Sequence, residues 1–131
     1  MTGKLINLEP PMLQSAHVIL AEDEDLVASA LAEALESYGF RVTIAHDGQE
    51  ALLAHAVDPA DALVTDMRMP RMGGPDLIQS LWETNPLLPV VVTTGYSEAI
   101  PSEEPGRLTV IMKPYRLAQV AGAVGRMLGH S

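Results

Sequence analysis

Short apolar runs without polar alternation are the feature that most constrains the fold of this chain. Such runs occupy residues 17–21, 62–66, 89–94 and 108–112, and polar residues follow each of them. An unbroken apolar run of this length is typical of a strand that is buried on both faces, as in a parallel sheet. Parallel strands need long crossovers, so helices must lie between the runs. The sequence therefore predicts alternating strands and helices.

The remaining segments fit this alternation and predict an α/β fold. We expect a doubly wound, five-stranded parallel sheet with right-handed crossovers and helices on both faces. The predicted strands lie at 17–21, 40–45, 62–66, 89–94 and 108–112, and the predicted helices at about 25–38, 47–57, 74–84 and 116–128.

Local signals support these helix boundaries. Asp25 and Asp47 are expected N-caps, because a short carboxylate accepts a hydrogen bond from the first turn. Gly39 is expected to end the first helix, and Pro75 to lie in the first turn of the third. Residues 97–107 contain two prolines and a glycine, so this segment is expected to form at most a short helix.

Composition limits the organisation and the partners of the chain. The 131 residues, 47% of them hydrophobic, suit one domain, predicted at 16–131 after a tail or linker at 1–15. The absence of cysteine excludes disulfides and thiol catalysis. No apolar run is long enough to span a bilayer, so we expect a cytoplasmic protein with no membrane contact. The net charge of −9 argues against direct binding of nucleic acid.

Polar side chains gather where the predicted strands end. Glu22 and Asp23 follow the first run, Asp66 ends the third strand, Thr94 ends the fourth, and Lys113 follows the fifth. The carboxyl ends of parallel strands open into a crevice, so we expect these side chains to lie together. Clustered carboxylates repel one another unless a cation binds. Oxygen ligands without cysteine or paired histidine favour Mg²⁺.

The order of these motifs resembles the receiver domain of two-component response regulators. The resemblance covers residues 17–128 and is closer to stand-alone regulators and hybrid kinases than to transcription factors. It implies a flavodoxin-like strand order 2-1-3-4-5, for which receivers are a known example. The motifs that carry it are Glu22-Asp23, Asp66-x-x-x-Pro70, Thr94-Gly95-Tyr96 and Lys113-Pro114-Tyr115.

The resemblance also implies a role for each site residue. Asp66 would accept a phosphoryl group from a histidine kinase or a phosphotransfer protein. Mg²⁺ would be bound by Asp23, by Asp66, by Glu22 largely through water, and by the backbone carbonyl of Arg68. Thr94 would donate to a phosphoryl oxygen. Lys113 would pair with the carboxylate and then with the phosphate, from a turn in which a cis Pro114 aims the lysine.

Two departures from the family pattern concern signalling. An aromatic residue often lies three positions before the lysine, but here the residue is Val110. The segment between Thr94 and Lys113 is also short and rich in proline, so the fourth helix is expected to be truncated. We therefore expect the phosphorylation signal to travel through the loop after Thr94. Because the chain ends with the last predicted helix and carries no DNA-binding domain, we expect the output to be a contact with another protein, a further domain outside this chain, or service as a phosphate sink.

Other interpretations remain open at this point. A small Mg²⁺-dependent phosphatase or hydrolase could share the layout, although Arg68, two residues after Asp66, cannot supply the acid that such enzymes use. A scaffold without chemistry is a third possibility, and Asp66 alone could simply cap a loop. Thr93 competes with Thr94, but it should point to the opposite face of a regular strand.

The resemblance implies self-catalysed phosphorylation and dephosphorylation without independent turnover.

Overall fold

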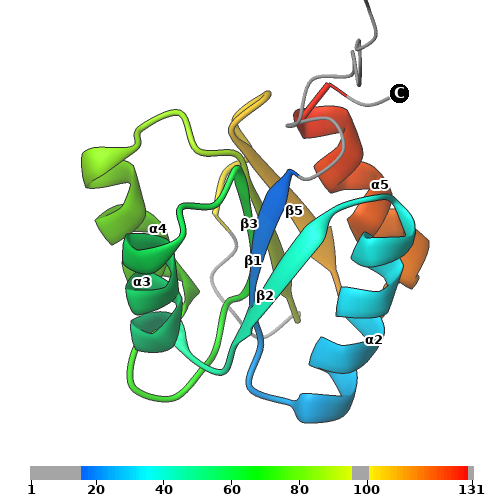
Figure 1. Ribbon diagram of the computed structural model, residues 1–131, viewed down its shortest axis with the longest axis horizontal. Coiled ribbons are helices and arrows are strands. Elements are labelled where there is room, and N and C mark those ends of the chain that lie inside the picture. Colours follow the sequence, from blue (N-terminus) through cyan, green and yellow to red (C-terminus); the bar gives the residue numbers. More distant parts are fainter. Residues whose placement is uncertain (1–15, 96–100, 130–131) are drawn as a thin grey trace, which may run out of the picture.

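A parallel sheet forms the centre of the computed structural model, which describes residues 16–95 and 101–129. The strand order is β2-β1-β3-β4-β5, and every pair is parallel, which confirms the predicted fold (Figure 1). β1 and β3 are buried throughout, as their unbroken apolar runs predict. The strands are β1 (His17–Ala21), β2 (Arg41–Ala45), β3 (Ala62–Asp66), β4 (Val90–Thr94) and β5 (Leu108–Met112).

Helices cover both faces of this sheet. The described helices are α2 (Asp25–Ser37), α3 (Gly48–Val57), α4 (Gly74–Thr84) and α5 (Leu117–Met127). In Figure 1, α2 and α5 lie on the right of the sheet, and α3 and α4 on the left. Neighbouring strand residues therefore enter different cores: Leu20 and Val64 pack under α2 and α5, whereas Ile19 and Leu63 pack under α3 and α4.

The local signals were correct except at the start of α2. Gly39 follows the helix with φ +96°, a left-handed conformation that favours glycine. The side chain of Asp47 accepts a hydrogen bond from the backbone N–H of Glu50 at 2.9 Å, as an N-cap should. Asp25, however, is the first residue of α2 and not its cap; Glu24 holds that position without a side-chain bond.

The connection between β4 and β5 differs from the other crossovers. Residues 101–107 contain no helix, and Glu104 instead forms an antiparallel bridge with Leu108. This agrees with the predicted loss of regular structure over 97–107, as far as the described residues extend. Tyr96 and the expected tail at 1–15 lie outside them. No described helix has the length and apolar character needed to cross a bilayer.

Candidate functional site

Asp66 ends β3 at the carboxyl edge of the sheet, where its side chain is almost fully buried. Thr65 is the register partner of Ala21 in β1, and Asp66 is the partner of Thr93 in β4. The residues that leave β1 and β4 therefore flank Asp66. Glu22 and Asp23 therefore lie next to Asp66 in the direction of β1, and Thr94 lies next to it in the direction of β4.

Lys113 reaches the same carboxylate from the end of β5. Its Nζ lies 3.1 Å from Oδ1 and 3.0 Å from Oδ2 of Asp66. The backbone N–H of Lys113 donates to the carbonyl of Thr94 at 2.8 Å, which ties the loop after β5 to the end of β4. The peptide bond between Lys113 and Pro114 is cis, as the resemblance implied. A charged hydrogen bond to both oxygens fixes the orientation of the carboxylate.

Three carboxylates converge at this edge. Ligand oxygens of Glu22, Asp23 and Asp66 all lie within 4.8 Å of one another. Glu22 and Asp66 are buried, whereas Asp23 is exposed, so the cluster is open to water on one side. Hard oxygen donors with an open side suit Mg²⁺, which retains part of its water shell. These residues therefore fit the ion that the family implies.

Glu22 carries the clearest electrostatic signature of the cluster. The pKa of Glu22 is raised to about 7, mainly by burial and to a smaller extent by the charges of Asp66 and Asp23. The backbone N–H of Glu24, which donates to Glu22 Oε2 at 3.1 Å, and the charge of Lys113 act in the opposite direction. A nearby cation favours the ionised form of a carboxyl group. A cation bound at the cluster would therefore favour the ionised form of Glu22 and lower its pKa.

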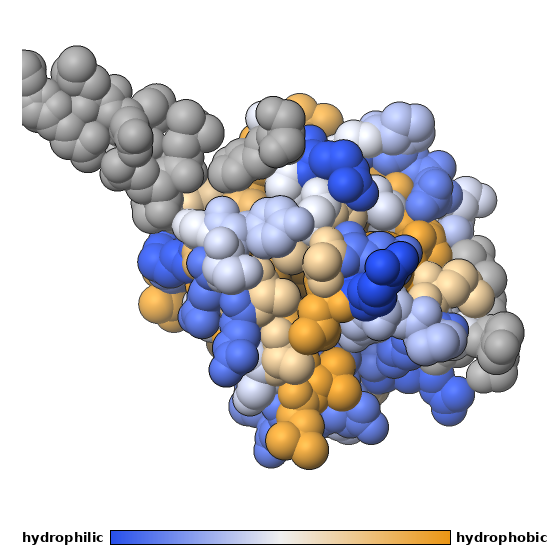
Figure 2. All heavy atoms as spheres, turned by 90° about the vertical axis from the view of Figure 1, so that its right-hand side faces the viewer, coloured by the Kyte–Doolittle hydropathy of each residue, from blue (hydrophilic) through white to orange (hydrophobic). Residues whose placement is uncertain are grey.

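The pKa of Tyr115 is also affected by the carboxylate cluster. Burial raises the pKa of Tyr115 to about 12, and the carboxylates of Glu22, Asp66 and Glu24 raise it as well. An exposed apolar strip lies beside this residue, on the face that carries α2 and α5 (Figure 2). Leu26 and Leu117 belong to it and border a groove of about 420 Å³. Apolar surface thus adjoins the carboxylate cluster.

Thr94 is fully buried at the last position of β4. Its hydroxyl donates to the carbonyl of Gly95 at 3.1 Å. Thr93 is also buried, and its carbonyl accepts from the backbone N–H of Met67 at 3.1 Å. Because successive strand residues point to opposite faces and Thr93 is the register partner of Asp66, regular alternation places Thr93 on the face of Asp66 and Thr94 on the other. The role of Thr94 in the site therefore stays a prediction from the family motif.

The loop after Asp66 is held by contacts that the sequence analysis missed. The guanidinium of Arg71 pairs with Oδ2 of Asp47, which is fully buried, and Arg71 has φ +65°, which is unusual for a residue with a side chain. A Cβ at Gly74 would lie 2.5 Å from the carbonyl oxygen of Asp66. The pair Gly73-Gly74 was a visible signal of this close approach, whereas nothing local linked Asp47 with Arg71.

Two further residues lie just beyond the ends of β3 and β2. Arg68 is exposed, and the role of its carbonyl as a ligand stays a prediction. His46 lies between two carboxylates, with Nε2 3.3 Å from Asp25 and Nδ1 3.1 Å from Glu50. The hydrogen bond to Glu50 and the charges of both carboxylates raise the pKa of His46. Asp25 therefore connects α2 to the loop before α3, in place of the capping role expected for it.

Comparison with known proteins identifies the family. The response regulator receiver domain matches residues 18–124. The chain belongs to this family. The receiver is 32% identical over 117 residues to response regulator MprA of Mycobacterium ulcerans, and it is 37% identical over 121 residues to sensor kinase CckA of Brucella abortus. A crystal structure of the receiver domain from hybrid histidine kinase CckA is 29% identical, with a TM-score of 0.71, over 86% of this chain and 98% of that one.

The relatives are longer than this receiver. The matched region is 87% of the chain in both sequence comparisons, but 50% of MprA and 13% of CckA. The receiver thus spans about half the length of the response regulators it matches and a small part of the sensor kinase. Receiver domains therefore occur in both regulators and kinases among its relatives.

Proposed function

We propose that Asp66 accepts a phosphoryl group from a histidine kinase or a phosphotransfer protein. The observation that carries the proposal is the contact of Lys113 Nζ with both carboxylate oxygens of Asp66, beside a cluster of three carboxylates. A ready nucleophile, an ammonium and an oxygen cluster for a cation are what phosphoryl transfer requires. Family membership supports the same reaction.

Each residue has a defined task in this reaction. An oxygen of Asp66 forms the new bond to phosphorus, and the bond from phosphorus to the donor nitrogen breaks. Lys113 holds Asp66 in place beforehand and then pairs with the phosphoryl group. Thr94 turns its hydroxyl from Gly95 toward a phosphoryl oxygen.

Glu22, Asp23, Asp66 and the carbonyl of Arg68 would hold the metal ion in this proposal. Bound Mg²⁺ would offset negative charge on the phosphoryl oxygens as phosphorus moves between donor and acceptor. Glu22 would then be ionised, because the cation compensates the burial that now favours its protonated form. The exposed side of Asp23 leaves room for water ligands and for the incoming phosphoryl group.

The partners that fit this chemistry are proteins. We infer that the receiver acts in the cytoplasm and that a phosphodonor docks on the apolar strip at Leu26 and Leu117. The net charge of −9 disfavours direct contact with nucleic acid, so the output is also proposed to be a protein contact. The phosphatase alternative gains no support, because Arg68 occupies the position where such an enzyme needs an acid.

Labelling with acetyl phosphate and Mg²⁺ tests the proposal. The wild-type protein should take up one phosphoryl group, and Asp66→Asn should take up none while its far-UV dichroism is unchanged. Asp76→Asn, an exposed change of the same kind in α4, is the matched control and should label normally. Labelling that persists in Asp66→Asn would show that another residue is the acceptor. Continuous turnover of a phosphoester by the wild type would favour a phosphatase.

A further inference from the structure

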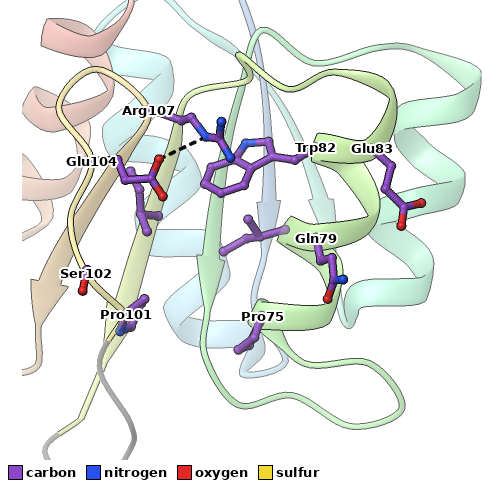
Figure 3. Close-up of a pocket in the computed structure, with 10 residues that line it drawn as sticks. Pro75, Gln79, Trp82, Glu83, Pro101, Ser102, Glu104 and Arg107 are labelled. Atoms are coloured by element: carbon purple, nitrogen blue, oxygen red, sulfur yellow. Dashed lines mark ion pairs between the residues drawn. The ribbon is translucent and has the colours of Figure 1, made fainter.

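A second groove lies on the opposite side of the sheet, between α4 and the chain that enters β5 (Figure 3). Its volume is about 570 Å³, which is comparable with sites that hold a small ligand or a few side chains. Pro75, Ile78 and Trp82 form the α4 wall, and Pro101 and Leu108 form much of the other. Polar residues at its margin are Gln79, Glu83, Ser102, Glu104 and Arg107.

The groove has a clear origin in the fold. The crossovers from β1 to β2, from β2 to β3 and from β3 to β4 each contain a helix that covers the sheet. In the connection from β4 to β5, the described residues 101–107 contain none. Among the described residues, the helices on this face, α3 and α4, therefore leave the sheet next to β5 without a covering helix. A helix laid beside α4 would complete the layer and bury the apolar walls.

The walls are already shaped before any ligand arrives. The indole Nε1 of Trp82 donates to the carbonyl of Leu88 at 2.9 Å, which fixes the ring. The guanidinium of Arg107 lies over this ring, 3.6 Å from its centroid. Its Nε is 3.4 Å from Glu104 Oε1 (Figure 3). The stacking restricts the orientation of Arg107, and its Nε makes an ion pair with Glu104 but no hydrogen bond within the described part of the chain. Little side-chain ordering thus remains to oppose binding.

The margin of the groove carries two carboxylates, Glu83 and Glu104, and one guanidinium, Arg107, and Glu83 points away from the ring of Trp82 (Figure 3). The charge of Arg107 is matched by Glu104, which leaves Glu83 exposed with no ion pair among the described residues. The chain as a whole carries a net charge of −9. We propose that the groove docks an amphipathic helix of a protein partner, with an apolar stripe against Trp82 and Pro101 and with lysine or arginine beside the stripe. Helix-in-groove binding combines these two features, apolar anchors and complementary flanking charge.

Trp82 gives this proposal a direct signal, because it is the only tryptophan in the chain. The probe is a synthetic peptide of about 18 residues, long enough to form a helix, with a leucine stripe, flanking lysines and no tryptophan. A second peptide carries glutamate in place of every lysine. The lysine peptide should change the Trp82 emission saturably below about 1 mM and shift amide signals at 75–83 and 101–108. The glutamate peptide should bind much more weakly.

Charge reversal at the margin provides the matched comparison. Glu83→Lys should weaken binding of the lysine peptide by about fivefold and strengthen binding of the glutamate peptide. Glu33→Lys makes the same change on an exposed position of α2, away from the groove, and should alter neither. Thermal unfolding of both variants checks that they fold alike. Equal effects of the two substitutions would mean that only total charge matters, and the proposal would be overturned.

Other occupants would be recognised in the same experiment. If Trp82 emission changes with protein concentration and sedimentation shows a dimer, the groove is filled by a second copy of the chain. If adding the peptide shifts the amide signals of residues 1–15 together with those of the groove, the N-terminal segment is the natural occupant. Either result, or the absence of any response of Trp82 to the peptides, overturns docking of a partner helix.

Discussion

Glu22 and Asp66 are two buried carboxyl groups at the same edge of the sheet, but their charged and polar neighbours differ. Asp66 has the ammonium of Lys113 on both oxygens, whereas for Glu22 a backbone N–H and the charge of Lys113 act against burial and the repulsion of the neighbouring carboxylates. Without a metal ion, the raised pKa therefore keeps Glu22 mostly protonated below about pH 7. The folded protein should consequently bind a proton at Glu22 that the unfolded chain releases at lower pH.

The stability of the metal-free protein should depend on pH through Glu22. Its pKa is raised from 4.5 to about 7, so its contribution to stability is present below pH 4.5 and is lost as the pH rises through 7. Between pH 5 and pH 8 the free energy of unfolding of the wild type should fall by on the order of 1–2 kcal/mol, because water near exposed Asp23 screens part of the full effect. In Glu22→Gln this fall should be absent. Urea unfolding at pH 5 and pH 8, without metal, measures it. Parallel pH profiles of wild type and variant would refute the assignment.

Magnesium binding should separate two adjacent acidic residues. Asp23 belongs to the carboxylate cluster, whereas Glu24 is exposed and has its side chain outside it. Asp23→Ala should therefore weaken Mg²⁺ binding by tenfold or more, which corresponds to about 1.4 kcal/mol or more of binding free energy. Glu24→Ala should leave Mg²⁺ binding nearly unchanged. Titration calorimetry with and without a phosphoryl analogue measures both, and binding should be tighter with the analogue. Similar losses in the two variants would mean that the acidic cluster was misassigned.

At the scale of elements, the start of α3 and the loop before α4 form one unit. Asp47 caps α3 through Glu50 and also pairs with Arg71 in the loop that follows Asp66. The backbone N–H of Gly48 donates to the carbonyl of Met72 at 2.9 Å, which adds a second connection. The position of the loop beside Asp66 therefore depends on a helix that contributes no residue to the carboxylate cluster.

Removing the cap of α3 should destabilise the protein more than changing the other end of the same helix. Asp47→Ala removes the cap and the partner of Arg71, and should lower the Tm by about 4 °C or more. Asp58→Ala, at the C-terminal end, removes an exposed pair with Arg41 and should lower it by about 2 °C or less. Differential scanning calorimetry of both variants makes the comparison. Equal shifts would indicate that the Arg71 contact contributes nothing.

The β4–β5 connection should carry the phosphorylation signal. In the proposed reaction Thr94 would move toward the phosphoryl group, and the described residues 101–107 have no helix that would resist the movement. Val110, which is half-buried, replaces the aromatic side chain that would follow the threonine in many relatives. Beryllofluoride with Mg²⁺ should therefore shift amide signals most at 101–107 and 113–117. If α4 moves while these segments do not, the signal takes another route, since a switch needs contacts that differ between its two states.

At the scale of the molecule, the fold could be predicted because burial on both faces leaves a simple sequence pattern. The bounds predicted for 17–21, 62–66 and 108–112 are those of β1, β3 and β5. The strand order could not be obtained from periodicity and depended on the resemblance, because the pairing of β1 with β3 is a long-range property. Of the candidate site, the motif residues were identified at the strand ends, where chain direction alone brings them together.

The missed features all arise from contacts between distant segments. Arg71 meets Asp47, and Arg107 covers Trp82, but no spacing in the sequence announces either pair. The burial of Glu22, which sets its pKa, also depends on how neighbouring strands and loops close over it. Side chains at strand ends are therefore predictable, whereas the residues that hold loops in place require the three-dimensional structure.

The interior position of β1, between β2 and β3, also sets the order in which the chain can fold. One edge of β1 pairs with β2 from Arg41 onward, and the other pairs with β3 only from Ala62 onward. All pairs are parallel, so no hairpin can form early and each pairing must close a long loop. During synthesis, β1 therefore cannot be paired on both edges until β3 has been made. A fragment that ends before β3 leaves one edge of β1, with its unpaired backbone N–H and C=O groups, open to pairing with other chains.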